Sequence, residues 1–165
     1  MSRSLLDLHP EVRWRAKNLK QSAQLISIPI VIHFTLRTSQ EQNALFEQGR
    51  GKPGPMVTNV RGGFSYHNYG LAFDFAMLKP GQTIDWNVKT DINADEIPDY
   101  EQVGELGEDL GLQWGGRFKS IRGDVGHLQM SFGFMVSQLM GFYKLGGLIR
   151  VWAEVDKVVE DGVWP

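Results

Sequence analysis

The sequence contains no cysteine, and this absence limits how the chain can be held together. Without disulfides, a fold of 165 residues must be stabilised by a hydrophobic core, which the 42% of hydrophobic residues can supply. The length predicts a single domain over residues 1–165. The absence also excludes a thiol nucleophile and cysteine-ligated zinc or iron–sulfur sites. Any metal ion must therefore be held by His, Asp or Glu, and the chain has only 4 histidines.

Charge and hydropathy argue against two classes of partner. The net charge is −2 and the sequence pI is about 6.1, so no basic field indicates a nucleic-acid-binding protein. The most apolar stretch, residues 132–149, contains Gln138, Lys144 and several glycines, which argues against stable membrane insertion. The N-terminus has no apolar stretch of signal-peptide length and no small-residue cleavage site. We therefore expect the chain to be made in the cytoplasm.

Hydrophobic periodicity and breaker residues predict a mixture of helices and strands. Ser39 and Gln42 form a predicted capping box for a short helix that ends at Gly49, and the Gly- and Pro-rich residues 50–66 predict a long loop. Further helices are expected over residues 9–26, 98–110 and, as two short pieces, 133–161; strands are expected over 30–36, 71–78, 83–88 and 127–132. This pattern predicts an α+β fold, a single domain with a small, mainly antiparallel sheet flanked by helices.

Two histidines and an aspartate have the chemistry of a metal site. His67 lies in a loop that leads to a predicted strand containing Asp74, and His127 opens another strand. Two imidazoles and a carboxylate suffice to hold a catalytic zinc ion and leave its fourth position open for water. Asp124 stands three residues before His127, close enough to act as a general base. Spacing alone leaves a second interpretation open, in which His67 is a hydrogen-bonding loop residue and Asp74 a surface residue.

Two separated motifs of the chain resemble the signature of one enzyme family. The motifs are S-x-H-x-x-G-x-A-x-D over residues 65–74 and D-x-x-H over residues 124–127. They resemble the LAS-type zinc peptidases, which include D-alanyl-D-alanine carboxypeptidases and dipeptidases and the L-alanyl-D-glutamate endopeptidases of bacteria and phages. The stretches EQNALFEQGRGKPGPMVTNVRGGFSYHNYGLAFDF and GLQWGGRFKSIRGDVGHLQM are most similar to the endopeptidases. The resemblance implies a LAS/hedgehog-like peptidase fold with its core over about residues 9–132 and a C-terminal helical extension over about 133–165.

The resemblance also implies roles for individual residues. Zinc would be held by His67, Asp74 and His127, with Asp124 as the general base. Arg37 would polarise the substrate carbonyl and stabilise the oxyanion, a role that suits a fixed cation. Three further residues would bind substrate or support the site: Ser65 near the substrate, Gln42 behind the Arg37 loop, and Trp114 either in the site wall or as a core aromatic.

The implied function is cleavage of the L-alanyl-D-glutamate bond in the peptidoglycan stem peptide by a monomeric endolysin. Such an enzyme would wait in the cytoplasm of a phage-infected cell and act on the wall after release, causing host cell lysis. Two alternatives stay open: a D-alanyl-D-alanine carboxypeptidase or dipeptidase, and a non-catalytic, zinc-stabilised cell-wall-binding module. The chain departs from the family pattern without losing any of the implied functional residues; the departures are Leu36, Thr38, Gly126 and Leu128.

Other conspicuous residues have ordinary structural explanations as well as functional ones. We expect His33 to be a hydrogen-bonded strand residue and His9 to cap or flank a helix start. The acidic residues between Asp91 and Glu101 suit a solvated helix start better than a calcium loop. Arg50, Lys52 and Arg61 are either substrate-binding or plain loop charges. The apolar stripe from Leu148 to Val159 is expected to cover the domain's own core.

Overall fold

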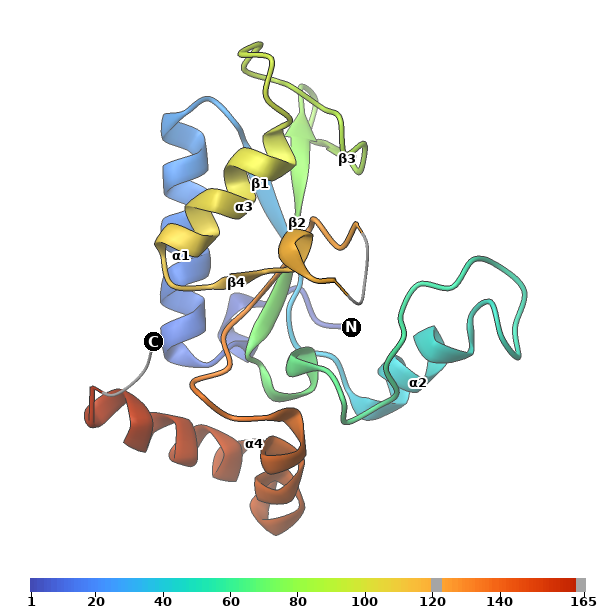
Figure 1. The fold of residues 1–165 in the computed structure, drawn as a ribbon, viewed down its shortest axis with the longest axis vertical. Helices are drawn as coiled ribbons and strands as arrows, with labels where there is room; N and C mark the ends of the chain where they lie inside the picture. Colours follow the sequence, from blue (N-terminus) through green and yellow to red (C-terminus); the bar gives the residue numbers. More distant parts are fainter. Residues whose placement is uncertain (120–122, 163–165) are drawn as a thin grey trace.

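The architecture is seen in a computed structural model that describes residues 1–119 and 123–162 (Figure 1). Residues 120–122, within the second stretch that resembles the zinc peptidases, and residues 163–165 of the expected C-terminal extension lie outside this description. The elements, in chain order, are η1 (Leu5–Asp7), α1 (Pro10–Leu25), β1 (Ile30–Phe34), α2 (Ser39–Glu47), η2 (Tyr66–Tyr69), β2 (Ala72–Lys79), β3 (Thr83–Asp85), α3 (Asp99–Asp109), β4 (Gln113–Trp114), η3 (Gly115–Arg117), β5 (His127–Gln129) and α4 (Val136–Glu160).

Strand β2 is the centre of an antiparallel sheet with the order β1-β2-β5-β4, and β3 also pairs with β2. Helices α1 and α3 lie on one side of this sheet in Figure 1, whereas α2 and the loop that follows it extend to the other side. The α+β class and the small antiparallel sheet predicted from sequence are therefore confirmed. The sheet is longest at β2, which is why residues contributed by β2 occupy the middle of the molecule.

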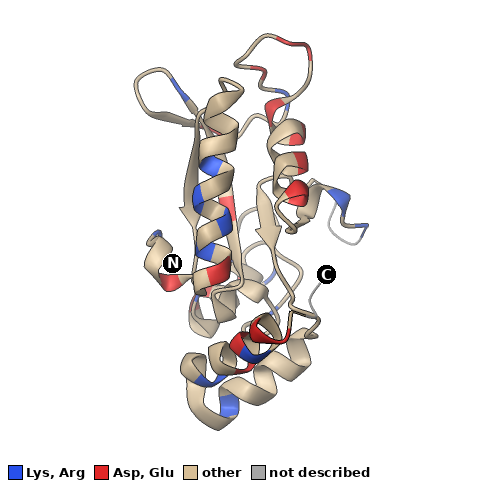
Figure 2. Cartoon of the chain, turned by 90° about the vertical axis from the view of Figure 1, so that its left-hand side faces the viewer, with Lys and Arg blue, Asp and Glu red and all other residues tan. Residues whose placement is uncertain are grey.

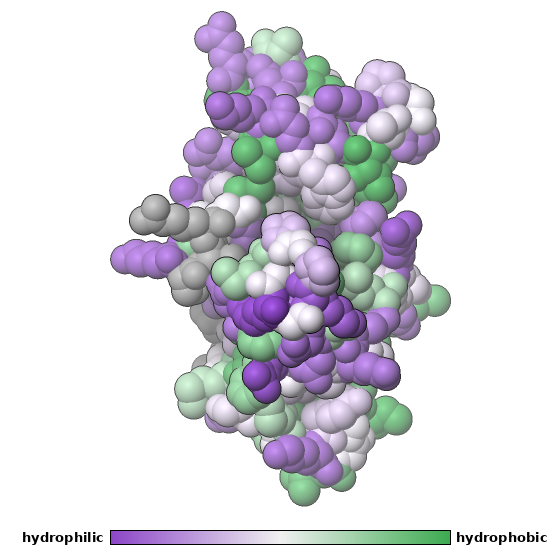
Figure 3. Space-filling model, turned by 90° about the vertical axis from the view of Figure 1, so that its right-hand side faces the viewer, coloured by the Kyte–Doolittle hydropathy of each residue, from purple (hydrophilic) through white to green (hydrophobic). Residues whose placement is uncertain are grey.

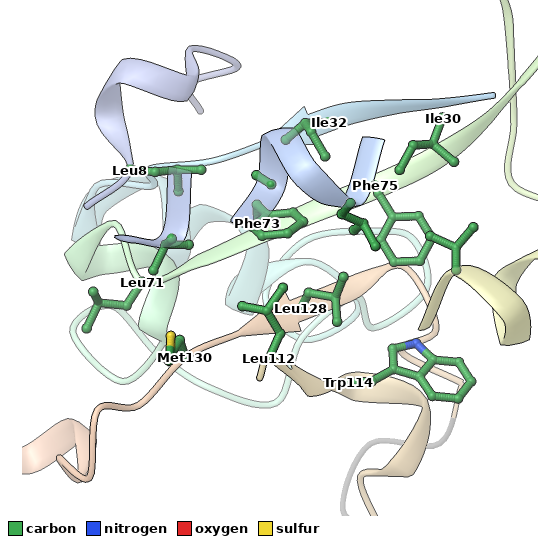
Figure 4. Packing of buried hydrophobic residues seen from close by; sticks show 14 of the residues in the cluster. Leu8, Ile30, Ile32, Leu71, Phe73, Phe75, Leu112, Trp114, Leu128 and Met130 are labelled. Carbon is green, nitrogen blue, oxygen red and sulfur yellow. The ribbon is translucent and has the colours of Figure 1, made fainter. Parts of the chain in front are cut away.

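Side-chain alternation along β2 separates a core face from a site face. Phe73 and Phe75 are fully buried beneath the helices, together with Leu128 of the neighbouring strand β5 (Figure 4). Asp74 lies between the two phenylalanines in sequence, so it points to the opposite face. Removing either phenylalanine side chain is expected to cost about 3–5 kcal/mol of stability. The apolar face thus fixes the sheet, and the sheet fixes the direction of Asp74.

Helices α1 and α3 pack beside one another with opposite charge. Figure 2 shows basic residues along α1 and acidic residues along α3. Arg15 of α1 is buried and donates from Nε to the carbonyl oxygen of Leu110 at 3.0 Å, and its Nη1 pairs with Glu11 at 2.7 Å. The carbonyl at the end of α3 is one of the groups that a helix cannot satisfy internally. This contact therefore joins the two helices at a point where α3 needs a donor.

The C-terminal segment forms two helical pieces joined at Gly146 and Gly147, whose φ/ψ values are not helical. The two short helices expected there are thus confirmed. Val151 and Val155 of the predicted apolar stripe are fully buried in the main core, so the stripe covers the domain itself as expected. Trp152 donates from Nε1 to the Tyr69 carbonyl at 2.8 Å, which ties α4 to η2. No helix within residues 1–119 and 123–162 is long and apolar enough to cross a membrane.

Several local details differ from the sequence predictions. The capping box of α2 is formed by Thr38 and Glu41, one residue earlier than predicted, because Thr38 has the extended backbone that a cap requires. Strand β3 ends at Asp85 rather than at residue 88. Strand β4 was not predicted, since two residues are too few to show an alternating pattern.

Candidate metal centre

Three side chains that are far apart in the sequence converge on the site face of the sheet. His67 Nε2, Asp74 Oδ1 and His127 Nδ1 lie 3.2 Å from one another in each pairing. Ligands placed tetrahedrally around an ion at ~2.1 Å lie about 3.4 Å apart, so these atoms are close to the spacing of a coordination shell. Among residues 1–119 and 123–162, this is the one group of three or more such side chains that could hold a metal ion.

The local fold explains the convergence. Asp74 and His127 are directly opposed across the antiparallel pair β2–β5, so their side chains leave the same face of the sheet. His67 lies in η2, which Ser65 caps by accepting a hydrogen bond from the His67 N–H at 3.3 Å. Gly70 ends η2 at a φ of 68°, and a Cβ there would lie 2.7 Å from a backbone carbonyl oxygen. Glycine thus permits the tight turn from η2 into β2.

Hydrogen bonds on the far side of each imidazole direct a lone pair toward the centre. His67 Nδ1 lies 2.7 Å from the carbonyl oxygen of Thr35, which can only accept, so Nδ1 carries the proton and Nε2 is free to bind a metal. His127 Nε2 lies 3.0 Å from Gln129 Oε1, and the Gln129 amide nitrogen donates to Gln113 Oε1 at 2.9 Å. Gln129 thereby presents its oxygen to His127, which leaves His127 Nδ1 facing the centre.

The electrostatics of the three residues fit a bound cation. Burial raises the pKa of Asp74, but the electrostatic interaction with His67 and the hydrogen bond with His127 outweigh burial and hold this pKa well below its usual range. Burial lowers the pKa of His127, yet its contact with the Asp74 carboxylate outweighs burial and raises it. Two imidazole lone pairs and a carboxylate at this spacing repel one another unless a positive charge lies between them. This donor set suits a transition-metal ion with open coordination positions.

Arg37 stands beside the ligands and is held from behind. Its Nη2 donates to Asp74 Oδ2 at 3.3 Å, and its Nη1 donates to Gln42 Oε1 at 2.8 Å. Gln42 is fully buried and donates in turn to the Val60 carbonyl at 2.9 Å, so it supports Arg37 as predicted. Burial lowers the pKa of Arg37, and the carboxylates of Asp74 and Asp124 oppose that effect. The Arg37 Nε is buried without a hydrogen-bond partner among the described residues.

Asp124 lines the same cavity but does not belong to the ligand group. Burial raises the pKa of its carboxyl group, as does the nearby Asp74 charge, while His127 opposes this. A carboxylate with a raised pKa is a better proton acceptor near neutral pH. The carbonyl of Asp124 accepts the His127 N–H at 3.2 Å, which holds the backbone of Asp124 in place. Gly115 packs closely against the same carbonyl, and a Cβ on Gly115 would lie only 2.3 Å from its oxygen.

A cavity of about 690 Å³ lies over the three ligand atoms, a volume typical of a small-ligand site. The structure brings Arg37, Ser65 and Asp124 to its wall together with the ligands. On the face shown in Figure 3, apolar patches (green) lie between the hydrophilic tip at the top and the hydrophilic protrusion at the centre. Apolar and aromatic side chains form much of the remaining cavity wall, among them Phe34, Val57, Phe64, Trp86, Val88 and Phe118.

Trp114 does not line this cavity, and it belongs to the hydrophobic core, which favours the core aromatic of the two interpretations left open by the sequence. The indole is buried and donates from Nε1 to the Val125 carbonyl at 2.8 Å. Since Val125 stands between Asp124 and His127, Trp114 supports the loop that carries both of them. Its contribution to the site is indirect.

The remaining conspicuous residues serve the fold. His9 caps α1 as expected, and its side chain is fully buried. Asp99 is also fully buried and accepts the Ile92 N–H at 3.0 Å, so the expectation of a solvated carboxylate is wrong there. Arg50 and Arg61 contact the ring of Phe46, at 4.0 Å and 4.8 Å from its centre. Neither arginine lines the cavity, nor does Lys52, which favours the interpretation as loop charges.

Sequence reasoning missed the two groups that orient the histidines. Gln129 carried a usable signal, because it lies two residues after His127 on a strand and therefore shares its face. The Thr35 carbonyl carried none, since a backbone oxygen is the same at every position and only the fold brings it to His67.

Comparisons with known proteins agree with this geometry. The family model described as D-alanyl-D-alanine carboxypeptidase, of the M15 peptidases, matches residues 58–130, which include the three candidate ligands and Asp124. The peptidoglycan L-alanyl-D-glutamate endopeptidase CwlK of Bacillus subtilis is 44% identical over 124 residues, covering 75% of this chain and 74% of that protein. The chain belongs to the M15 peptidases. M15 peptidases are metallopeptidases. We therefore expect the reaction to take place at the candidate metal centre.

A solved structure has a similar fold. The crystal structure of the Serratia marcescens L-Ala D-Glu endopeptidase ChiX is similar with a TM-score of 0.52 and 21% identity, covering 79% of this chain and 88% of that one. At this identity the likeness concerns the fold alone. It extends the match beyond the segment of the family model, which begins after Arg37 and ends before α4.

Proposed function

We propose that the chain is a zinc-dependent endopeptidase that hydrolyses the L-alanyl-D-glutamate bond of peptidoglycan stem peptides. The observation that carries this proposal is the equal 3.2 Å spacing of His67 Nε2, Asp74 Oδ1 and His127 Nδ1 beneath a cavity. Two imidazoles, one carboxylate and an open side are the donor set of catalytic zinc sites. The name of CwlK supports the choice of bond, at 44% identity.

The side chains around the cavity suit amide hydrolysis. Zinc held by His67, Asp74 and His127 would supply Lewis-acid activation of water and of the peptide carbonyl. Arg37 places a cation at the cavity wall, where it would bind the carbonyl oxygen as negative charge develops. Asp124 would accept a proton from the attacking water and return it to the departing amine nitrogen, and its raised pKa suits both steps.

A second candidate function is cleavage of a D-alanyl-D-alanine bond, which is favoured by the description of the matching family model. The two activities share the same metal ligands, and they differ in their products. An endopeptidase exposes a new amino-terminal D-glutamate, whereas a carboxypeptidase releases D-alanine. A non-catalytic wall-binding module would release neither, although Arg37 and Asp124 have no evident purpose in such a module.

The first experiment is digestion of purified peptidoglycan with and without a chelator, followed by mass spectrometry. We expect fragments with amino-terminal D-glutamate that disappear with the chelator and return when zinc is added. Release of D-alanine would retain the site and change the specificity. No product from a folded, zinc-loaded sample would contradict both enzyme functions.

The role of Asp124 is tested by Asp124→Asn, which keeps the size of the side chain. We expect kcat to fall by about 10²–10⁴ while one zinc ion is still bound per chain, because Asp124 is outside the ligand group. Asp109→Asn, at an exposed position on the far end of α3, is the matched control and should leave kcat unchanged. Full turnover by Asp124→Asn would remove Asp124 from the mechanism.

We also propose that the wall is reached from the producing cell's cytoplasm, as in phage lysis, which the sequence resemblance implies. Purified protein added to permeabilised bacteria should then reduce turbidity, and the Asp124→Asn variant should not. Digestion of isolated wall without any lysis of such cells would favour wall turnover instead.

A further inference from the structure

Trp86 is an exposed aromatic side chain on the wall of the metal cavity. It is 51% exposed, although it follows directly after β3 and lines the cavity together with Phe34 and Val88. None of the hydrogen bonds that build the metal centre involves it. A large apolar surface left open to solvent inside a ligand cavity indicates a contact with a ligand.

The backbone on either side of Trp86 is firmly anchored. Asp85 accepts hydrogen bonds from the Asn87 N–H at 2.9 Å and from the Thr90 hydroxyl at 2.6 Å, and it pairs with Lys79 Nζ at 2.6 Å. The carbonyl of Asp85 also accepts the Tyr100 hydroxyl at 2.9 Å. Trp86 is therefore presented by a fixed turn, so a ligand would not have to order it first.

The indole ring has neighbours on two sides. It lies nearly perpendicular to the ring of His33, with centroids 5.0 Å apart and an interplanar angle of 83°. A Cβ built on Gly126 would lie 3.8 Å from Trp86 Cζ3 and 2.9 Å from the Phe75 carbonyl oxygen. Gly126 immediately precedes His127, so the indole lies beside the strand that supplies a candidate ligand. A Cβ at this position would be in ordinary contact with the ring, and it is the Phe75 carbonyl that it would crowd.

This part of the wall matches an uncharged, C–H-rich ligand. Among the described residues that line the cavity, Arg37 has the one positively charged side chain outside the ligand group. Phe34, Trp86 and Val88 are uncharged. The stem peptide is asymmetric around the bond proposed to be cut. Anionic D-glutamate lies on one side, and on the other side L-alanine is joined through a lactyl group to the pyranose ring of muramic acid. The polarised C–H groups of a pyranose complement the negative face of an indole.

We infer that Trp86 binds the muramic acid ring of the substrate and gives the enzyme a preference for sugar-linked stem peptides. This inference rests on the proposed function, since it places the sugar next to the same scissile bond. Trp86 is thus a specificity-determining residue, and the substrate class is a muramoyl peptide rather than a free peptide.

The test compares two substrates: an N-acetylmuramoyl-linked stem peptide and the same peptide carrying an acetyl group in place of the sugar and lactyl group. We expect the wild-type protein to favour the first, and Trp86→Ala to reduce the ratio of the two kcat/KM values by about tenfold, chiefly through KM. Trp86→Phe should restore part of the ratio. Trp14→Ala removes a tryptophan that is 54% exposed on α1 outside the cavity, and it should leave the ratio unchanged.

Equal losses with both substrates, or no change with either, would overturn the inference. If the wild-type protein cuts neither substrate, the result contradicts the proposed function. The role of Trp86 is then tested by a binding measurement instead. In that case N-acetylmuramoyl-L-alanine is titrated while the indole N–H resonances are followed by NMR, with Trp86→Phe identifying the Trp86 signal. A selective shift of that signal supports the inference, and an unshifted signal contradicts it.

Discussion

The two histidines of the candidate metal centre each present a ring nitrogen to the same point, and they are oriented by different means. His67 is held by a backbone carbonyl, that of Thr35, at 2.7 Å. His127 is held by a side chain, Gln129, at 3.0 Å, which is itself held by Gln113. A carbonyl oxygen persists through any substitution that preserves the fold, whereas an amide side chain can be lost in one step. The comparison teaches that one half of the site depends on topology and the other half on residue identity.

The largest effect is expected when either ligand is removed, because the comparison concerns orientation and not the ligands themselves. His67→Ala and His127→Ala should each abolish stoichiometric metal binding and lower kcat/KM by more than about 10³-fold. Metal content after dialysis and peptidoglycan cleavage provide the two measurements. His9→Asn, which alters a buried histidine that does not line the cavity, is the control. Retention of metal by either alanine variant would mean that the ligand set is different.

The next largest effect is expected for Gln129→Leu, which removes the partner of His127 and keeps a side chain of similar size. Loss of an orienting hydrogen bond of this kind typically weakens metal binding by about 10–100-fold. Competition with a chelator of known affinity measures the change. Gln129→Glu keeps an acceptor for His127 Nε2 and should bind metal more tightly than Gln129→Leu. Equal affinities of wild type and Gln129→Leu would show that β5 alone orients His127.

His9 supplies a reference for a buried histidine that has no metal to bind. Burial lowers its pKa, although contact with Asp156 opposes this, so the folded protein holds it neutral. Below about pH 6.5 the unfolded chain takes up a proton more readily than the folded one, so stability falls as pH falls. Denaturant unfolding at pH 7.5 and pH 5.5 should show a smaller loss for His9→Asn, whose asparagine can still cap α1. A parallel loss in both proteins would contradict this origin.

The smallest effect on metal affinity is expected for Thr35→Val. This variant tests directly whether the backbone of Thr35, and not its side chain, orients His67. The substitution removes the hydroxyl that donates to the Ser4 carbonyl at 3.0 Å, but it retains the carbonyl oxygen that orients His67. Metal affinity should stay within about twofold of wild type, while the free energy of unfolding falls by about 1 kcal/mol. A tenfold loss of metal affinity would show that the hydroxyl, and not only the backbone, positions His67.

Residue types and their spacing were enough to predict the chemistry of the site. His67, Asp74 and His127 could be selected because a metal needs these side chains and the chain has no cysteine to compete with them. Spacing had already singled out Asp124, the resemblance added Arg37, and the structure brings both to the cavity wall. Their proposed roles still await the experiments above.

The features that sequence reasoning missed are those that depend on distant backbone. The Thr35 carbonyl reaches His67 only after β1 and η2 are assembled, and Trp114 turns inward because its indole finds the Val125 carbonyl. The cap of α2 lies at Thr38 rather than Ser39 since either residue could serve, and the chain's path after β1 decides between them. Patterns in the local sequence cannot predict contacts that depend on distant parts of the chain.

The pairing of Asp74 with His127 across β2 and β5 links the metal to the assembly of the sheet. If β5 slipped by one residue along β2, His127 would move to the core face and its place would be taken by Gly126 or Leu128. An ion that needs both side chains would bind the native alignment and reject the slipped one. A ligand that binds only the native state stabilises that state by mass action. Metal binding would therefore favour the native alignment of β5 on β2 over the slipped alignment. A newly made chain would then acquire its catalytic competence and its correct sheet in the same event.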